Sequence, residues 1–222
     1  NNAAISAYTG VYIDLNSASQ SADKGEVFLR RKSSTCFEAV AEQFKKIPGS
    51  PIVYWIGSRV RAVFSELPPL RESGNACSGL QTGNNDKYLR LWPEVSQAKT
   101  FLRQHNQESP LTGRWLLHRK GGDFRRWYGN QEYVLDWADD GREIKANPSA
   151  RPQNTKLWFK EAVTWSHTSF SFGARYEPAG STFNVEGPSY FSDDAVFATG
   201  LMCSAPVLYL MQLMNPTMHF LV

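Results

Sequence analysis

The chain has 222 residues and a hydrophobic content of 41%, enough to bury the core of one large or two small domains, which excludes a disordered tail. Its formal net charge of +3 is far below the basic balance that identifies a nucleic-acid binder by itself. The charges are nevertheless uneven, because cations concentrate in residues 111–130 and the last 32 residues contain no Lys or Arg.

The cysteine pattern and the hydropathy of the chain indicate the cellular compartment in which we expect the protein. Cys36, Cys77 and Cys203 are odd in number and widely spaced, with no secretory signal ahead of them, so we expect a reduced, cytoplasmic protein. No apolar run reaches the length of a membrane span, and no membrane partner is expected. Because the chain starts at Asn1 without an initiator Met and stops inside "MHFLV", we expect a fragment cut at both ends.

The first 70 residues predict two strands and two helices. The segments 8–15 and 26–31 are rich in β-branched and aromatic residues, which favours strands. Residues 35–46 have helical spacing, ended by a proline and a glycine. Ser50 and Pro51 are suited to begin a second helix, whose apolar residues recur at steps of three and four through Phe64.

From residue 71 onward, short strand-like segments alternate with glycine turns. The predicted strands are "WLLHR", "EYVLDW", "LWFKEAVTW", "GARYE" and "STFNV". A short helix is expected after Ser192, Asp193 and Asp194, followed by an apolar helix over about 204–214. The fold class is therefore predicted as α+β, with connecting strands and a helical strip over 1–70, a strand-rich domain over 71–222 and helices at the C-terminal end.

Sequence motifs of catalysis are missing. The chain contains no glycine-rich dinucleotide or phosphate loop, no HExxH and no GxSxG. Its four histidines lack metal-ligand spacing, so no metal site is expected. The acids of "DWADDGRE" could form an acid/base pair, but a solvated helix start explains Asp139 and Asp140 better.

Two glycine-containing segments are the candidate binding loops. The first, residues 77–92, combines flexible glycines with short hydrogen-bonding side chains suited to phosphate oxygens or base edges, and a plain turn is the alternative reading. Its candidates are Gly79, Gln81, Thr82, Gly83, Asn84, Asn85 and Arg90.

The second candidate loop, "KGGDFRRWY", places cations beside aromatic rings, a combination suited to phosphate contact or base stacking, and a solvated face is the alternative reading. Its candidates are Lys120, Gly121, Gly122, Arg125, Arg126, Trp127 and Tyr128. Four other tryptophans in the strand-rich part, Trp115, Trp137, Trp158 and Trp165, are expected in the core.

A series of ordered motifs over residues 40–217 resembles the adenine-specific DNA methyltransferases of BREX phage-exclusion systems, the PglX type. The matching blocks are "KIPGSPIVYW", "GLQTGNNDKYLRLW", "KGGDFRRWYGNQEYVLDW", "DDGREIK", "RPQN", "FKEAVTWS", "FNVEGPS" and "LMNPT".

This resemblance implies a target recognition region that reads double-stranded DNA, attached to a Rossmann-like domain that binds S-adenosylmethionine and methylates adenine N6. The catalytic Asn/Asp-Pro-Pro-aromatic motif is missing from this chain, because "NPS" and "NPT" lack the second proline. We therefore expect no catalytic residue, no cofactor and no activity in this chain alone, and the missing methyltransferase domain as a partner.

The implied roles divide between the loops. Lys120, Arg125 and Arg126 would neutralise phosphates, whereas Gln81, Asn84, Asn85 and Arg90 would lie nearer the base edges. One alternative is a protein-interaction module that docks other BREX subunits or a phage-encoded DNA mimic. Another is an independent enzyme such as a glycan hydrolase, suggested by the tryptophans and by Asp136, Asp139, Asp140 and Glu143.

Overall fold

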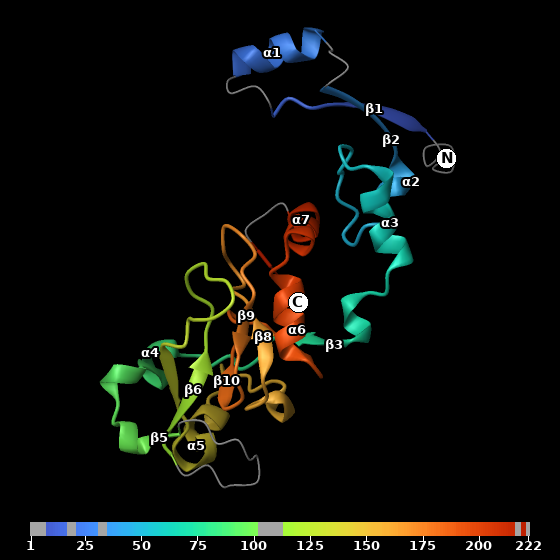
Figure 1. Cartoon of the computed structure of the whole chain (residues 1–222). Coiled ribbons are helices and arrows are strands. Elements are labelled where there is room, and N and C mark those ends of the chain that lie inside the picture. Colours follow the sequence, from blue (N-terminus) through green and yellow to red (C-terminus); the bar gives the residue numbers. More distant parts are fainter. Residues whose placement is uncertain (1–7, 17–20, 31–34, 102–112, 216–218, 221–222) are drawn as a thin grey trace. The chain divides into compact units, whose positions relative to one another are not determined.

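The computed structural model describes residues 8–16, 21–30, 35–101, 113–215 and 219–220. The chain divides into two compact units, Asn1–Pro69 and Leu70–Val222. Figure 1 shows both units, coloured along the sequence.

The first unit is built on a two-stranded antiparallel sheet and three helices. Its elements are β1 (Thr9–Ile13), α1 (Ser21–Arg30), β2 (Cys36–Val40), α2 (Ala41–Phe44) and α3 (Ser58–Glu66). A ring cluster forms the core, in which Tyr12 stacks on Tyr54 at 5.2 Å and meets the edge of Phe44 at 5.7 Å.

One prediction for this unit was wrong and two were right only in part, since α2 and most of α3 lie inside the predicted helices. Residues 26–30 belong to α1, which an Arg30–Glu26 ion pair of 2.9 Å supports one turn apart. Residues 36–40 form β2, because pairing with β1 overrides their helical spacing. The helix expected from Pro51 begins only at Ser58, since residues 50–57 form turns that bury Val53 and Ile56.

The second unit contains two sheets. The five-stranded mixed sheet has the order β10-β6-β7-β4, with β5 also paired to β6 in parallel. The antiparallel four-stranded sheet has the order β3-β11-β8-β9. The strands are β3 (Gly74–Cys77), β4 (Leu89–Leu91), β5 (Thr100–Phe101), β6 (Trp115–Arg119), β7 (Tyr133–Asp136), β8 (Ala162–Thr164), β9 (Arg175–Glu177), β10 (Ser181–Phe183) and β11 (Ser189–Ser192).

Four α-helices accompany these sheets: α4 (Asn85–Tyr88), α5 (Ala138–Ala146), α6 (Ala195–Met202) and α7 (Ala205–Met214). Short 3-10 turns occupy Leu70–Glu72, Trp92–Glu94, Gln97–Lys99 and Thr155–Leu157. The predicted C-terminal helices are confirmed, and Asp194 caps α6 by accepting the Phe197 N–H at 2.8 Å. The five predicted strand segments all contain strands, which confirms the α+β class.

Two apolar clusters form the core of the described part of this unit. One joins the two sheets, since it contains Leu116 and Leu135 of one and Ala162 and Phe191 of the other. The second lies where α6 packs against β8, β9 and β11. The core placement of Trp137, Trp158 and Trp165 is confirmed, since each is at most 5% exposed. Trp115 is half-buried.

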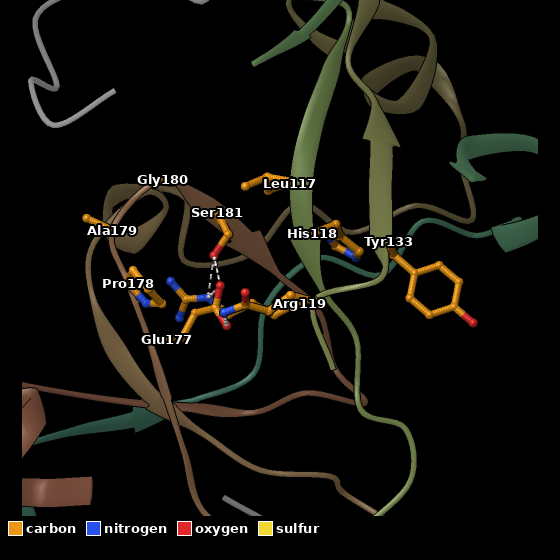
Figure 2. A pocket seen from close by; sticks show the side chains of 10 residues that line it. Leu117, His118, Arg119, Tyr133, Glu177, Pro178, Ala179, Gly180 and Ser181 are labelled. Carbon is orange, nitrogen blue, oxygen red and sulfur yellow. Dashed lines mark hydrogen bonds and ion pairs between the residues drawn. The ribbon is translucent and has the colours of Figure 1, made fainter. Parts of the chain in front are cut away.

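The parallel pair β6–β10 encloses charged side chains. Arg119 is 3% exposed and donates to Ser181 Oγ at 2.6 Å and to the Lys160 carbonyl at 2.6 Å. Figure 2 shows its guanidinium converging with Glu177 and Ser181, and the nearest ion-pair distance to Glu177 is 3.8 Å. Burial lowers the pKa of Arg119 to about 10 despite the Glu177 charge.

None of the described helices has by itself the length and hydropathy of a membrane span. The adjacent helices α6 and α7 meet that criterion only when taken together, and their axes bend by 69° at the junction.

His118 makes the stability of the fold sensitive to acid. Its Nδ1 lies 2.8 Å from Thr182 Oγ1, and burial, helped by the charges of Lys120 and Arg119, lowers its pKa from 6.5 to about 3. Between these two values the unfolded chain binds a proton that the folded ring does not, so stability falls as the pH drops below 6.5. Above pH 6.5 the ring is neutral in both states and contributes no pH dependence.

We expect urea unfolding to show this as a loss approaching about 1.4 kcal/mol per pH unit from this residue. The variant His118→Gln keeps a polar group but does not titrate, so its free energy of unfolding should fall less than that of the wild type between pH 7 and pH 4. Parallel pH profiles of the two proteins would contradict this assignment.

Candidate nucleic-acid interface

An open cleft of about 270 Å³ brings the first candidate loop against a segment that follows β10. One wall consists of residues 80–85, between β3 and α4. The other wall consists of Asn184, Val185 and Glu186, between β10 and β11.

Gly79 fixes the approach of the two walls. Its N–H donates to the Asn184 carbonyl at 3.3 Å, and the next N–H, that of Leu80, donates to the Phe183 carbonyl at 2.8 Å. A Cβ on Gly79 would lie 2.1 Å from the Phe183 carbonyl oxygen. This glycine therefore permits close contact between two chain segments, where the sequence suggested close approach to a ligand.

The polar side chains of the first wall differ in their availability. Thr82 is buried and donates to Asn85 Oδ1 at 2.6 Å, and Asn84 caps α4 by accepting the Lys87 N–H at 3.0 Å. Gln81 is exposed, and its backbone pairs with that of Arg151 through two hydrogen bonds of 3.0 and 2.8 Å. Gln81 and Asn84 are both exposed, but the amide oxygen of Asn84 is occupied by the cap of α4.

Two other candidates have local structural roles. Gly83 adopts φ +72°, and a Cβ there would lie 2.7 Å from the backbone of Ser149. Arg90 folds back on its own chain, where its guanidinium donates to the carbonyls of Asp86 and Leu89, both at 2.6 Å. Arg90 does not line the cleft.

The start of the second candidate loop contacts the opposite side of the same 184–187 segment. Lys120 Nζ lies 3.4 Å from Glu186 Oε2, and a Cβ on Gly121 would lie 2.4 Å from the Glu186 carbonyl oxygen. Gly122, with φ +114°, offers its carbonyl to Ser166 Oγ at 2.8 Å. Both candidate loops therefore border one short stretch of chain.

The end of the second loop runs along β9 instead. The Trp127 N–H donates to the Ala174 carbonyl at 2.8 Å, and its own carbonyl accepts from the Tyr176 N–H at 2.8 Å. These bonds hold Trp127 at φ +75° with its side chain 55% exposed, beside Tyr128 at 50%.

The two arginines of this loop differ. Arg125 is exposed, with an ion-pair distance of 3.8 Å to Glu132. Arg126 is half-buried and donates to the Cys203 carbonyl at the end of α6, while its Nε is buried without a partner among the described residues. Arg125 is therefore accessible to an anion, whereas Arg126 joins the loop to α6.

The acids that could have suggested hydrolytic chemistry are paired with cations, as Asp136–Arg114, Asp139–Arg142, Asp140–Lys145 and Glu143–Lys87. The hydrogen bond from Lys145 lowers the pKa of Asp140, which is opposite to the shift that a general acid needs. Asp139, Asp140 and Gly141 have φ between +52° and +66°, so the expected helix start is a left-handed turn.

The described residues contain no group of three His, Cys, Asp or Glu side chains arranged to hold a metal ion. All three cysteines are free thiols.

Sequence reasoning missed two residues that line the cleft, Asn184 and Glu186, and it missed Arg151, whose backbone pairs with that of Gln81. Asn184 Oδ1 accepts the N–H groups of Glu186 at 2.9 Å and Gly187 at 3.0 Å, which fixes the shape of the segment. The blocks "FNVEGPS" and "RPQN" contain all three, but nothing local in them indicates proximity to Gln81.

The chain is similar in sequence to one part of each of two longer proteins. No family model matches the chain. It is 37% identical over 191 residues to the adenine-specific methyltransferase PglX of Lacticaseibacillus casei (strain Zhang), an alignment that covers 80% of this chain and 16% of that protein. It is 35% identical over 193 residues to the adenine-specific methyltransferase BrxX of Escherichia coli O9:H4 (strain HS), covering 83% and 15%. The chain thus spans about one sixth of the length of these curated relatives.

Gly121 tests the close contact beside the cleft. Gly121→Ala would place a methyl group against the Glu186 carbonyl, and we expect a loss of about 1–3 kcal/mol in the free energy of unfolding. The control Gly200→Ala lies in α6, where no atom is within 4 Å, and should stabilise the protein by up to about 1 kcal/mol. Equal stability of the two variants in urea titrations would refute the packing role.

Proposed function

We propose, from its homology to adenine-specific methyltransferases, that this chain is the target recognition part of an S-adenosylmethionine-dependent DNA adenine-N6 methyltransferase of a BREX phage-defence system. In this proposal residues 71–222 form the DNA-reading domain and residues 1–70 connect it to the preceding region. The methyltransferase domain of the same protein is its partner, and the protein acts in the cytoplasm. The observation that carries the proposal is that the first loop and the start of the second loop, Lys120 and Gly121, both border residues 184–187.

In the proposal, some residues contact the phosphates of the DNA backbone and others contact the bases. Arg125 and Arg151 are exposed and suited to phosphates, which supply affinity without sequence preference. Gln81 and the partly buried Asn85 are suited to base edges, since amides pair with the N6 and N7 positions of adenine. Trp127 and Tyr128 present exposed rings beside Arg125, a combination that favours stacking on bases.

Gly79 and Gly121, the two glycines beside the described cleft, leave no space for the methyl donor. The space in front of Gly79 and Gly121 is filled by the carbonyls of Phe183 and Glu186, so these glycines form no cradle for a nucleoside cofactor. In the proposal, S-adenosylmethionine and the flipped adenine are bound by the partner domain, and this chain holds the duplex in register.

A protein-interaction module is the second candidate. The exposed side chains of Val196 (66%) and Phe197 (68%) on α6 favour it, because an apolar surface of this kind is suited to a protein partner, either another BREX subunit or a phage DNA mimic. A complex that survives nuclease treatment but is lost in Phe197→Ser would support this role, whereas the phosphate-contact variants below would leave it intact.

Removal of the two accessible arginines tests phosphate contact. We expect Arg125→Ala with Arg151→Ala, in the complete protein, to weaken DNA binding and to reduce the slope of log affinity against log salt by about two units. Lys160→Ala, in the cleft bordered by residues 72–75 and 191–193, is the control and should leave the slope unchanged. A slope unaffected by the double substitution would remove the phosphate assignment.

Substitution of Gln81 tests base reading. We expect Gln81→Ala to relax the methylated sequence at one position, because the truncated side chain no longer pairs with its base, and sequencing of modified adenines measures this. Gln212→Ala, on an exposed position of α7, is the control. An identical methylation motif in wild type and Gln81→Ala would exclude this residue from base reading.

A further inference from the structure

Glu186 is an acid placed where a DNA-binding surface should repel one. It lines the cleft opposite the first candidate loop, and its side chain is 50% exposed. A carboxylate at this position disfavours phosphate, so electrostatic attraction to the DNA backbone does not explain it.

The backbone of Glu186 is held from several directions. Its N–H is bound by Asn184 Oδ1 at 2.9 Å, and its carbonyl accepts the His167 N–H at 2.9 Å. Gly121 packs directly against the same carbonyl, and the preceding Asn184 backbone is bound by Gly79 and by Arg119. Such anchoring limits the positions of the carboxylate, as the preorganisation of a recognition residue requires.

The carboxylate is also positioned by a cation. Lys120 Nζ lies 3.4 Å from Oε2, so the pair is close to neutral overall and the cost of placing the acid near DNA is reduced. An ionised carboxylate only accepts hydrogen bonds, so its partner must be a donor. On the edge of a duplex in the major groove, the donors are the exocyclic amino groups of cytosine and adenine.

We propose, on the basis of the DNA-recognition function above, that Glu186 is a specificity-determining residue that accepts a hydrogen bond from the exocyclic amino group of one base in the target sequence. Lys120 orients this carboxylate, in addition to any phosphate contact that it makes. Gln81, on the facing wall of the cleft, contacts a neighbouring position.

The test uses the complete protein and a set of duplexes in which each position of the methylated sequence is varied in turn. Wild type should bind best when one position holds an amino-bearing base, and comparison of cytosine with adenine there identifies which one is read. Glu186→Gln should lower the discrimination at that position about 10- to 100-fold while the other positions keep theirs. Its affinity for unrelated DNA should rise, because a repulsive charge is removed and Lys120 is released.

Control variants separate this role from a structural one. Glu161→Gln removes an exposed acid that accepts from the Tyr176 hydroxyl at 2.8 Å, and it should change neither base preference nor affinity. Thermal unfolding of Glu186→Gln should match wild type, since its backbone bonds remain. A Glu186→Gln protein that binds every sequence more tightly by the same factor would overturn the proposal. Wild-type protein that binds all duplexes equally, or none, would overturn the DNA-recognition function itself.

Discussion

The geometry of the cleft depends on two places where backbone meets backbone without room for a side chain. At Gly79 the chain touches the carbonyl of Phe183, and at Gly121 it touches the carbonyl of Glu186. Residues 183–187 are thereby held between two loops that lie some 40 residues apart in sequence. Because both contacts are fixed by backbone atoms, the side chains of Gln81, Lys120 and Glu186 start from defined positions. Short polar side chains on mobile loops would not be positioned with the same precision.

Buried charged side chains lie in the sheets that carry the two candidate loops. Arg119 and Arg175 are each at most 3% exposed, and the pKa of each is lowered to about 10 by burial. Only one buried acid, Glu177, accompanies them among the described residues. Neutral oxygens also accept hydrogen bonds from them, Ser181 Oγ from Arg119 and Ser166 Oγ from Arg175, and Ser166 in turn donates to the Gly122 carbonyl. Such groups are costly to bury, so their value lies in specifying one arrangement of strands and loops.

The sequence predicted β6 to β10 and the C-terminal helices of the second unit, because alternation, caps and glycine turns are local signals, but it did not predict β3, β5 or β11. In the first unit, Cys36–Val40 has helical spacing but pairs with β1, so a contact distant in sequence decided the outcome. Composition indicated the candidate loops, but it did not indicate which of their side chains form hydrogen bonds within the protein. Arg126 and Arg90 are of a residue type that often contacts DNA, yet both donate to backbone carbonyls of this protein. The sequence analysis did not select Glu186, because a negatively charged side chain is not expected where a negatively charged polymer would bind.

The parallel pairing of β10 with β6 joins residues more than 60 positions apart, and it delivers Glu186 to a cleft whose other wall begins at Leu80. Under the proposed DNA-reading function, one loop alone would therefore not be a transferable reading unit. Exchange of only one loop between relatives would place its side chains and glycines opposite a wall from the other protein, to whose carbonyls they are not fitted. If the proposal holds, a change in the recognised sequence would require exchange of roughly residues 79–187 together, or point changes at exposed positions such as Gln81.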